Sequence, residues 1–298
     1  MTRNQKWLLG VFLAFFVIAG GIIFTVVAVA IFGSSDLKLA GSFGERVGIV
    51  EISGIIDEPE SVLRQIKAFR KDESVRAVVV RVNSPGGGVS PSQEIYAGLV
   101  KLREEAEKPV VASMGSVAAS GGYYVACAAD SILASPGSLT GSIGVLIEFP
   151  DFQEVLKKVG IGFEVIKSAE HKDIGSPFRR ITEKERGILQ EMVDDVFDQF
   201  VEVVSSERQL SRDSVLAFAD GRIFSGRQAC HLGLVDRTGD FQDAIDTAGR
   251  MCGLGENPKT VRLRKRRPSW LDLINDTATR LQNPASVIGS PRLLYLFR

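Results

Sequence analysis

A serine lies in a run of small residues, Ala118-Ala119-Ser120-Gly121-Gly122. A β-branched run precedes it and an alanine-rich run follows, a pattern that predicts a strand, a tight turn and a helix. A serine at the start of a helix lies beside amide donors and the positive end of the helix dipole, which stabilise a developing oxyanion. The same position suits an N-cap serine, so this stretch alone favours neither a nucleophile nor a cap.

Two other loops of small residues flank this turn along the chain, residues 85–88 before it and residues 136–144 after it. In a parallel sheet all three loops leave the same edge. Because glycine lets backbone amides approach a ligand closely, the amide of Gly87 could form an oxyanion hole with the amide of Ser120 or its neighbour. The alternative is that these glycines only serve a turn between a strand and a helix.

A serine nucleophile needs a base. A Ser-His-Asp triad would have to use His171 or His231, the two histidines of the chain. Lys172 is a second candidate, because a buried lysine can accept a proton near neutral pH. By residue type alone, a surface position in a charged loop is the more common place for such a lysine.

Composition excludes several classes of function. The formal net charge is zero, which argues against a nucleic-acid partner. The three cysteines form no C-x-x-C spacing and no cluster with the histidines, so neither a zinc site nor any other cofactor is predicted. Cys127 falls in the alanine-rich run, where a small core residue is expected.

The amino-terminal region differs in composition from the rest. Residues 7–32 are uncharged and apolar, and as a helix they would be about 39 Å long, enough to cross a bilayer. Arg3 and Lys6 precede the run, which predicts a cytoplasmic segment 1–6, a transmembrane anchor and a body outside the cytoplasm. The alternative is a signal peptide cleaved after Ala28-Val29-Ala30. Residues 33–44 read as a linker.

Strands and helices alternate through the remaining chain. The pattern predicts an α/β fold with a mostly parallel sheet and helices on both faces. Ser90 is expected to cap the helix that begins at Pro91, and Thr182-Glu183-Lys184-Glu185 resembles a capping box. Predicted strands span 46–56, 75–82, 109–113, 131–134 and 163–166; predicted helices span 60–70, 91–107, 125–129, 152–159, 182–208, 212–218, 226–232 and 241–251.

Four motifs occur in a characteristic order: N-S-P-G-G, A-S-G-G-Y-Y, T-G-S-I-G and K-D-I-x-S-P. Together they resemble the bacterial signal peptide peptidase A family, serine/lysine peptidases with the fold of the Clp protease and crotonase superfamily. The resemblance runs from about residue 45 to 255 and includes D-G-R-I-F-S-G-R-Q-A at 220–229. It implies a catalytic domain over 45–255, followed by a basic and apolar tail over 256–298.

The resemblance also implies residue roles and partners. Ser120 would be the nucleophile, Lys172 the general base and Ser142 the residue that orients the lysine, while Gly87 and Ser120 would supply oxyanion-hole amides. No cofactor is implied. Family members form rings or domes, so a homo-oligomer is expected. The implied substrates are apolar remnant signal peptides, cut at the outer side of the cell membrane by a single-pass protein.

Other functions remain open on sequence grounds. A related membrane-bound protease that cuts stomatin-like proteins would share the same dyad. A crotonase-type acyl-CoA enzyme would share the oxyanion-hole layout, and an anchored scaffold could keep the fold without activity. The apolar end, residues 293–297, is expected to dock, either in the substrate groove of a neighbouring copy or against its own core.

Overall fold

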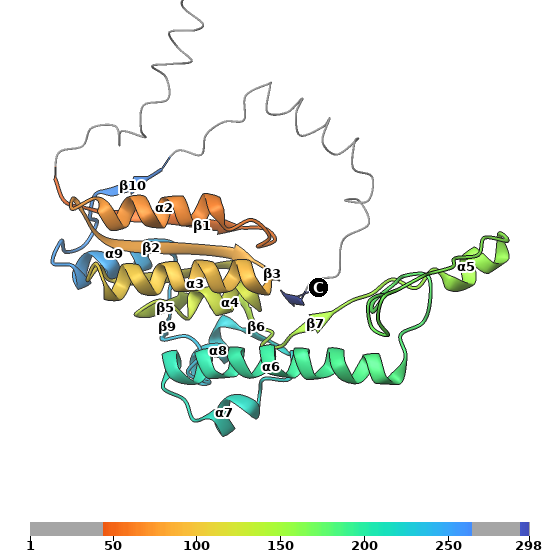
Figure 1. Ribbon diagram of the computed structural model, residues 1–298. Helices are drawn as coiled ribbons and strands as arrows, with labels where there is room; N and C mark the ends of the chain where they lie inside the picture. The colour runs from red at the N-terminus through yellow and green to blue at the C-terminus, as the bar shows by residue number, and fades with distance from the viewer. Residues whose placement is uncertain (1–43, 264–292, 298) are drawn as a thin grey trace, which may run out of the picture. The chain divides into compact units, whose positions relative to one another are not determined.

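The computed structural model describes residues 44–263 and 293–297 (Figure 1). The predicted anchor, the signal-peptide alternative and nearly all of the predicted linker lie outside these residues. No helix within the described ranges is long and apolar enough to cross a membrane. The strands are β1 (Arg46–Ser53), β2 (Val75–Ser84), β3 (Gly86–Gly88), β4 (Val110–Ala119), β5 (Ser131–Ala134), β6 (Leu139–Gly141), β7 (Leu146–Ile147), β8 (Ile223–Ser225), β9 (Arg237–Thr238), β10 (Thr260–Arg262) and β11 (Leu293–Leu296).

The helices are interspersed with these strands along the chain (Figure 1). They are α2 (Glu60–Lys71), α3 (Val89–Glu104), α4 (Gly121–Ala126), α5 (Gln153–Lys158), α6 (Glu183–Arg208), α7 (Arg212–Leu216), α8 (Gly226–His231) and α9 (Phe241–Met251). The predicted capping box is present, because Thr182 and Glu185 exchange hydrogen bonds at the start of α6.

The main sheet has eight strands, and its principal order is β10-β1-β2-β4-β5-β9. All neighbours along this path are parallel. β6 continues the sheet beside the end of β4, and β8 pairs with β6 in the antiparallel sense. The predicted α/β class with a mostly parallel sheet is confirmed. A second sheet, in the order β3-β11-β7, lies beside the candidate site.

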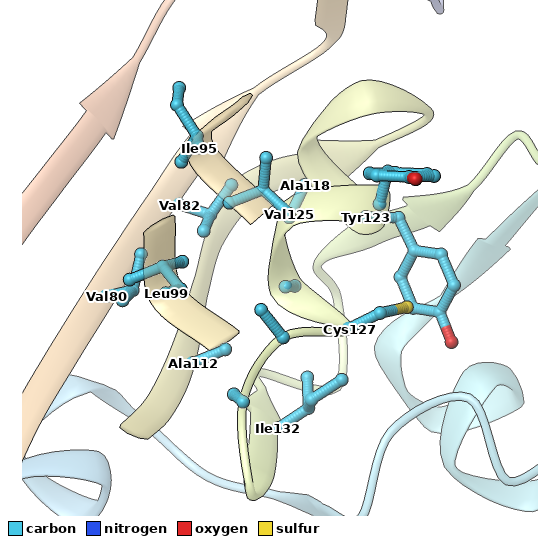
Figure 2. Packing of buried hydrophobic residues seen from close by; sticks show 14 of the residues in the cluster. Val80, Val82, Ile95, Leu99, Ala112, Ala118, Tyr123, Val125, Cys127 and Ile132 are labelled. Atoms are coloured by element: carbon cyan, nitrogen blue, oxygen red, sulfur yellow. The ribbon is translucent and has the colours of Figure 1, made fainter. Parts of the chain in front are cut away.

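Both faces of the main sheet are buried, which explains its near-continuous valine runs. Along β2, Ala77 and Val79 pack in the smaller apolar cluster with α9, whereas Val78, Val80 and Val82 pack in the larger one. Figure 2 shows the larger cluster, in which residues from β2, β4 and β5 meet residues from α3 and α4. Cys127 lies within it, fully buried, as predicted.

Local predictions were wrong at several places. The helix predicted over 125–129 begins at Gly121 and ends at Ala126. Residues 163–166 form no strand: they have no neighbouring strand to pair with, and Ile166 is 97% exposed. Ser90 does not cap α3, because that helix begins at Val89 with Gly88 in the N-cap position. β4 is longer than predicted, because after it leaves β5 its last residues pair with β6.

Candidate active site

Ser120 lies at the junction of β4 and α4, in the N-cap position of the helix. Its backbone has φ +53° and ψ −117°, a conformation that non-glycine residues rarely adopt. Its amide donates to the carbonyl of Gly141 (2.8 Å), and its carbonyl accepts from the amide of Tyr124 (2.8 Å). The side chain makes no capping hydrogen bond, so Ser120 occupies a cap position without acting as a cap.

Close packing behind Ser120 holds this strained turn. Every residue of α4 is buried, and the hydroxyl of Tyr123 donates to the carbonyl of Leu234 (2.9 Å). A Cβ on Gly122 would lie 2.9 Å from the backbone oxygen of Ser84, so the helix approaches the end of β2 closely. The glycines after Ser120 are therefore required by packing as well as by the turn.

Gly87 lies between two glycines, Gly86 and Gly88, that both form backbone hydrogen bonds with Ile56. The carbonyl of Gly86 accepts from the amide of Ile56 (2.9 Å), and the amide of Gly88 donates to the carbonyl of Ile56 (2.7 Å). Because successive residues of an extended chain direct their polar groups to opposite sides, the amide of Gly87 faces away from Ile56, toward β11. A Cβ on Gly87 would lie 2.1 Å from the oxygen of Ile56, which excludes any side chain here.

The glycine loop and the Ser120 turn are adjacent. A Cβ on Gly86 would lie 2.8 Å from the amide nitrogen of Gly121. Gly121 is the first residue of α4, so its amide has no acceptor within the helix. The glycine loop therefore lies next to the first residue of α4, and backbone amides so close to a serine could serve as oxyanion-hole donors.

Ser142 follows β6, the strand whose Gly141 binds the Ser120 amide. It also has a positive φ, +50°, and its amide donates to the carbonyl of Arg222 (2.8 Å). Its side chain is nearly buried and lines a cavity of about 530 Å³ that also contacts Leu296 and Phe297. The structure therefore brings Ser120, Ser142 and Gly87 into one region.

Within the described part of this chain, no hydrogen bond or ion pair connects the side chain of Lys172 to Ser120, Ser142 or Gly87. The lysine side chain is exposed and makes no hydrogen bond or ion pair in the described part of the chain. It lies in the segment between β7 and α6, which carries α5 (Figure 1). Of the two histidines, His171 lies 3.7 Å from a carboxylate oxygen of Glu170, and His231 is exposed at the end of α8.

A charged network next to Lys172 was missed by the sequence analysis. The guanidinium of Arg179 donates to Asp173 (Nε 2.8 Å) and to Glu185 (Nη2 2.6 Å), and the amine of Lys167 donates to Asp173 (2.6 Å). These bonds hold the pKa of Asp173 well below its usual range. Hydrogen bonds from Arg179, followed by those from Thr182, lower the pKa of Glu185 to about 2. The network ties the Lys172 loop to the start of α6.

The apolar end of the chain docks beside the glycine loop. β11 pairs antiparallel with β3, placing Tyr295 opposite Gly87, and with β7 on its other side. Tyr295 is fully buried, stacks on Tyr124 with ring centroids 5.2 Å apart, and donates to the carbonyl of Val196 (3.2 Å). The expected docking of the tail is confirmed on its own chain. The groove of a neighbouring copy stays a prediction.

Comparison with known proteins places this site in a family. The model of peptidase family S49 matches residues 103–254. The chain belongs to peptidase family S49. The matched residues include Ser120, Ser142 and Lys172, while Gly87 lies before them.

Three relatives of this S49 peptidase are named as proteases or peptidases. The chain is 42% identical to a putative protease of Synechocystis, over 74% of this chain and 78% of that protein. It is 38% identical to a putative signal peptide peptidase SppA of Enterococcus faecium, over 63% of this chain and 54% of that protein. It is 35% identical to Protease 4 of Haemophilus influenzae, over 69% of this chain but only 35% of that protein. Family and relatives identify a serine-type peptidase and confirm the predicted resemblance.

Proposed function

We propose that this S49 peptidase is a membrane-anchored endopeptidase that degrades remnant signal peptides and similar apolar peptides, with Ser120 as its nucleophile. The observation that carries the proposal is the strained turn at Ser120, whose hydroxyl makes no hydrogen bond in the described chain and which adjoins the glycine loop of residues 86–88. Strained backbone of this kind clusters at active sites, where it holds a reacting side chain in place.

The oxyanion hole consists of the amides of Gly87 and Gly121. The amide of Ser120 is already bonded to Gly141, which favours its neighbour as the second donor. The amide of Gly87 faces β11, where a bound peptide would lie. Both donors belong to a buried backbone, so they need little reorganisation when negative charge develops on the substrate oxygen.

Lys172 is the general base in this proposal and Ser142 orients its amine. The neutral amine takes the proton of the Ser120 hydroxyl as the Oγ–C bond forms. The same proton passes to the departing amine as the C–N bond breaks, leaving an acyl ester on Ser120. Water then attacks the ester while Lys172 takes a proton from it; the C–Oγ bond breaks, Lys172 returns the proton to the Ser120 oxygen, and the acid product leaves.

The dyad is completed by assembly, we propose, with Lys172 reaching Ser120 of another copy in a ring or dome. Lys172 is exposed within one chain, whereas Ser120 is 1% exposed. The segment that carries Lys172 also exposes many large apolar side chains, which an interface between copies would cover. They are Phe152, Val155, Val159, Ile161, Phe163, Val165 and Ile166.

The substrate binds as an added strand between β3 and β7, the position that β11 takes. Backbone pairing of this kind accepts many sequences, and the buried aromatic pocket around Tyr295 favours apolar ones. A single-pass anchor over residues 7–32, with the catalytic domain outside the cytoplasm, would hold the site near peptides released in the membrane.

Hydrolysis of synthetic signal peptides tests the proposal. The full chain in detergent micelles should cut these peptides, and Ser120→Ala should lower kcat by at least about 10⁴-fold. A fluorophosphonate probe should label Ser120 in the wild-type protein alone. Unchanged hydrolysis in Ser120→Ala would exclude the serine mechanism, and a folded wild type that neither cuts nor labels would favour a scaffold.

A further inference from the structure

Two buried serines contact the loop that presents Gly87. Ser84 is the last residue of β2, and Ser92 lies in the first turn of α3. Both are fully buried, and each directs its hydroxyl to the backbone of a glycine next to Gly87. Neither takes part in the reaction steps described above.

Ser84 fixes the residue before Gly87. Its hydroxyl oxygen accepts a hydrogen bond from the amide of Gly86 (3.0 Å). The carbonyl of Gly86 is occupied by the amide of Ile56. Both polar groups of Gly86 are therefore bonded, and its amide is not available as an oxyanion donor.

Ser92 fixes the residue after Gly87. Its hydroxyl donates to the carbonyl of Gly88 (2.8 Å), whose amide is bonded to the carbonyl of Ile56. The same hydroxyl oxygen would lie only 2.6 Å from a Cβ on Gly121. Ser92 thus lies between the two backbone segments to which Gly87 and Gly121 belong.

We propose that Ser84 and Ser92 are positioning residues that hold the amide of Gly87 in register with that of Gly121. The proposal rests on the proposed peptidase function. A run of glycines has more backbone freedom than any other sequence, so a donor within it is poorly defined unless its neighbours are fixed. Hydrogen bonds weaken steeply when the donor angle departs from linearity, so a small rotation at Gly87 reduces its effect on the oxyanion.

The simpler role for these hydroxyls is structural, since buried serines commonly bond to nearby backbone. That role affects the free energy of unfolding and leaves the transition state untouched. Positioning predicts a selective loss of transition-state stabilisation, because the hole contacts the substrate oxygen only when it becomes an oxyanion. The two roles therefore differ in kcat and in the affinity of a tetrahedral inhibitor.

The test compares Ser84→Ala and Ser92→Ala with Ser138→Ala in the full chain. Ser138 is a matched control, because it is also buried and its hydroxyl donates to the carbonyl of Gly115 (2.7 Å), away from the glycine loop. We measure kcat and KM on a synthetic signal peptide, Ki for a peptide boronate, and Tm. Active sites are counted with a fluorophosphonate, so that kcat refers to folded enzyme alone.

Each of the two variants is expected to lower kcat about tenfold, with KM within about twofold and Ki for the boronate raised in proportion to the loss. Ser138→Ala should keep the wild-type kcat and Ki even where its Tm falls. Wild-type kcat and Ki in both glycine-loop variants, or an equal kinetic loss in Ser138→Ala, would overturn the proposal. Full activity in Ser120→Ala would instead refute the peptidase mechanism itself.

Discussion

Ser120 has a backbone conformation that is unfavourable in isolation, and its surroundings maintain it. Gly141 binds its amide, Tyr124 binds its carbonyl, and the buried helix α4 follows directly. Holding a serine in this way costs on the order of 1–3 kcal/mol, which the packing of α4 offsets. The result is a hydroxyl presented at a fixed position instead of one bonded to its own helix.

The pH dependence of hydrolysis tests the base. We expect kcat/KM to rise with pH, because only the neutral form of a lysine amine accepts the Ser120 proton. Lys172→Ala should abolish hydrolysis while the far-UV circular dichroism spectrum stays unchanged. His171→Ala is the control and should keep most of the activity; loss in this variant with full activity in Lys172→Ala would indicate a Ser-His enzyme.

The substitution Gly87→Ala tests whether the amide of Gly87 belongs to the oxyanion hole. Gly87→Ala places a Cβ about 2 Å from the backbone of Ile56, so the loop must move and its amide turns away. We expect kcat to fall about 100-fold, measured with a synthetic signal peptide. Gly137→Ala is the control, because a Cβ there meets no atom within 4 Å. Near-wild-type kcat in Gly87→Ala would exclude its amide from the hole.

For single residues, the sequence predicted the small-residue loops and the proximity of Ser120, Ser142 and Gly87. Parallel topology explains that success, since loops after neighbouring strands share an edge. The resemblance implied the amide of Ser120 as the second donor, whereas in the structure this amide donates to the carbonyl of Gly141 and leaves the amide of Gly121 as the candidate. This difference depends on the pairing of β4 with β6, a contact that no local pattern encodes.

The loop that carries Lys172 is fixed to α6 by charge. Arg179 lies between two carboxylates, those of Asp173 and Glu185, and the carboxylate of Glu185 is nearly buried. Because Asp173 follows Lys172 directly in the chain, this network limits the positions that the Lys172 backbone can take. The network is the main polar connection that the structure shows between this loop and α6.

Acid should release this loop. The pKa of Glu185 is lowered to about 2 in the folded chain, below the usual value of about 4.3. Its contribution to stability is therefore complete above about pH 4.3 and is lost as the pH falls toward 2. Protection of residues 167–182 against hydrogen exchange, relative to the intrinsic exchange rate at each pH, should fall over that range, and in Glu185→Gln it should already be low at pH 6. Equal exchange in both proteins at pH 6 would contradict this prediction.

The tail should compete with substrate, because β11 occupies the strand position beside Gly87. Tyr295→Ala removes a fully buried ring and should weaken tail docking by about 3 kcal/mol. We expect faster hydrolysis of a subsaturating signal peptide in this variant than in Leu293→Ala, whose side chain is only partly buried. Unchanged rates in both variants and in a deletion of residues 290–298 would refute competition.

Elements with a strong internal pattern were predicted well. α9 has the predicted bounds, and α6 differs by one residue at its start because its capping box defines that end. The strand predicted over residues 163–166 is absent, because a β-like pattern forms a strand only beside a partner strand. β11 could be predicted only as a docking segment, since its partners β3 and β7 are far away in sequence.

At the scale of the molecule, one chain contains both residues of the proposed dyad, but the side chains of Ser120 and Lys172 form no hydrogen bond with each other in the described residues. Ser120 is buried against α4, and Lys172 is exposed on a segment rich in exposed apolar side chains. Phe163 and Phe178 stack on each other, with ring centroids 3.9 Å apart, yet both remain exposed. These features favour a site that assembles between copies.

Mixed oligomers test this directly. Ser120→Ala and Lys172→Ala are each expected to be inactive, but co-expressed and purified through two different tags they should recover activity. If each site takes Ser120 from one copy and Lys172 from the next, random mixing restores about a quarter of the wild-type sites. A dyad formed within one chain gives no recovery, so an inactive mixed oligomer would refute the shared site.

The pairing of β11 has a consequence for solubility. β3 and β7 both belong to a sheet in which β11 is the middle strand. When the tail leaves, each of them presents unpaired backbone groups along an open edge, and such edges recruit strands from other molecules. The docked tail therefore protects the resting protein from edge-to-edge aggregation. Any modification that releases the tail exposes the backbone groups of β3 and β7. These groups can pair with a peptide substrate or with a strand of a misfolded neighbouring molecule.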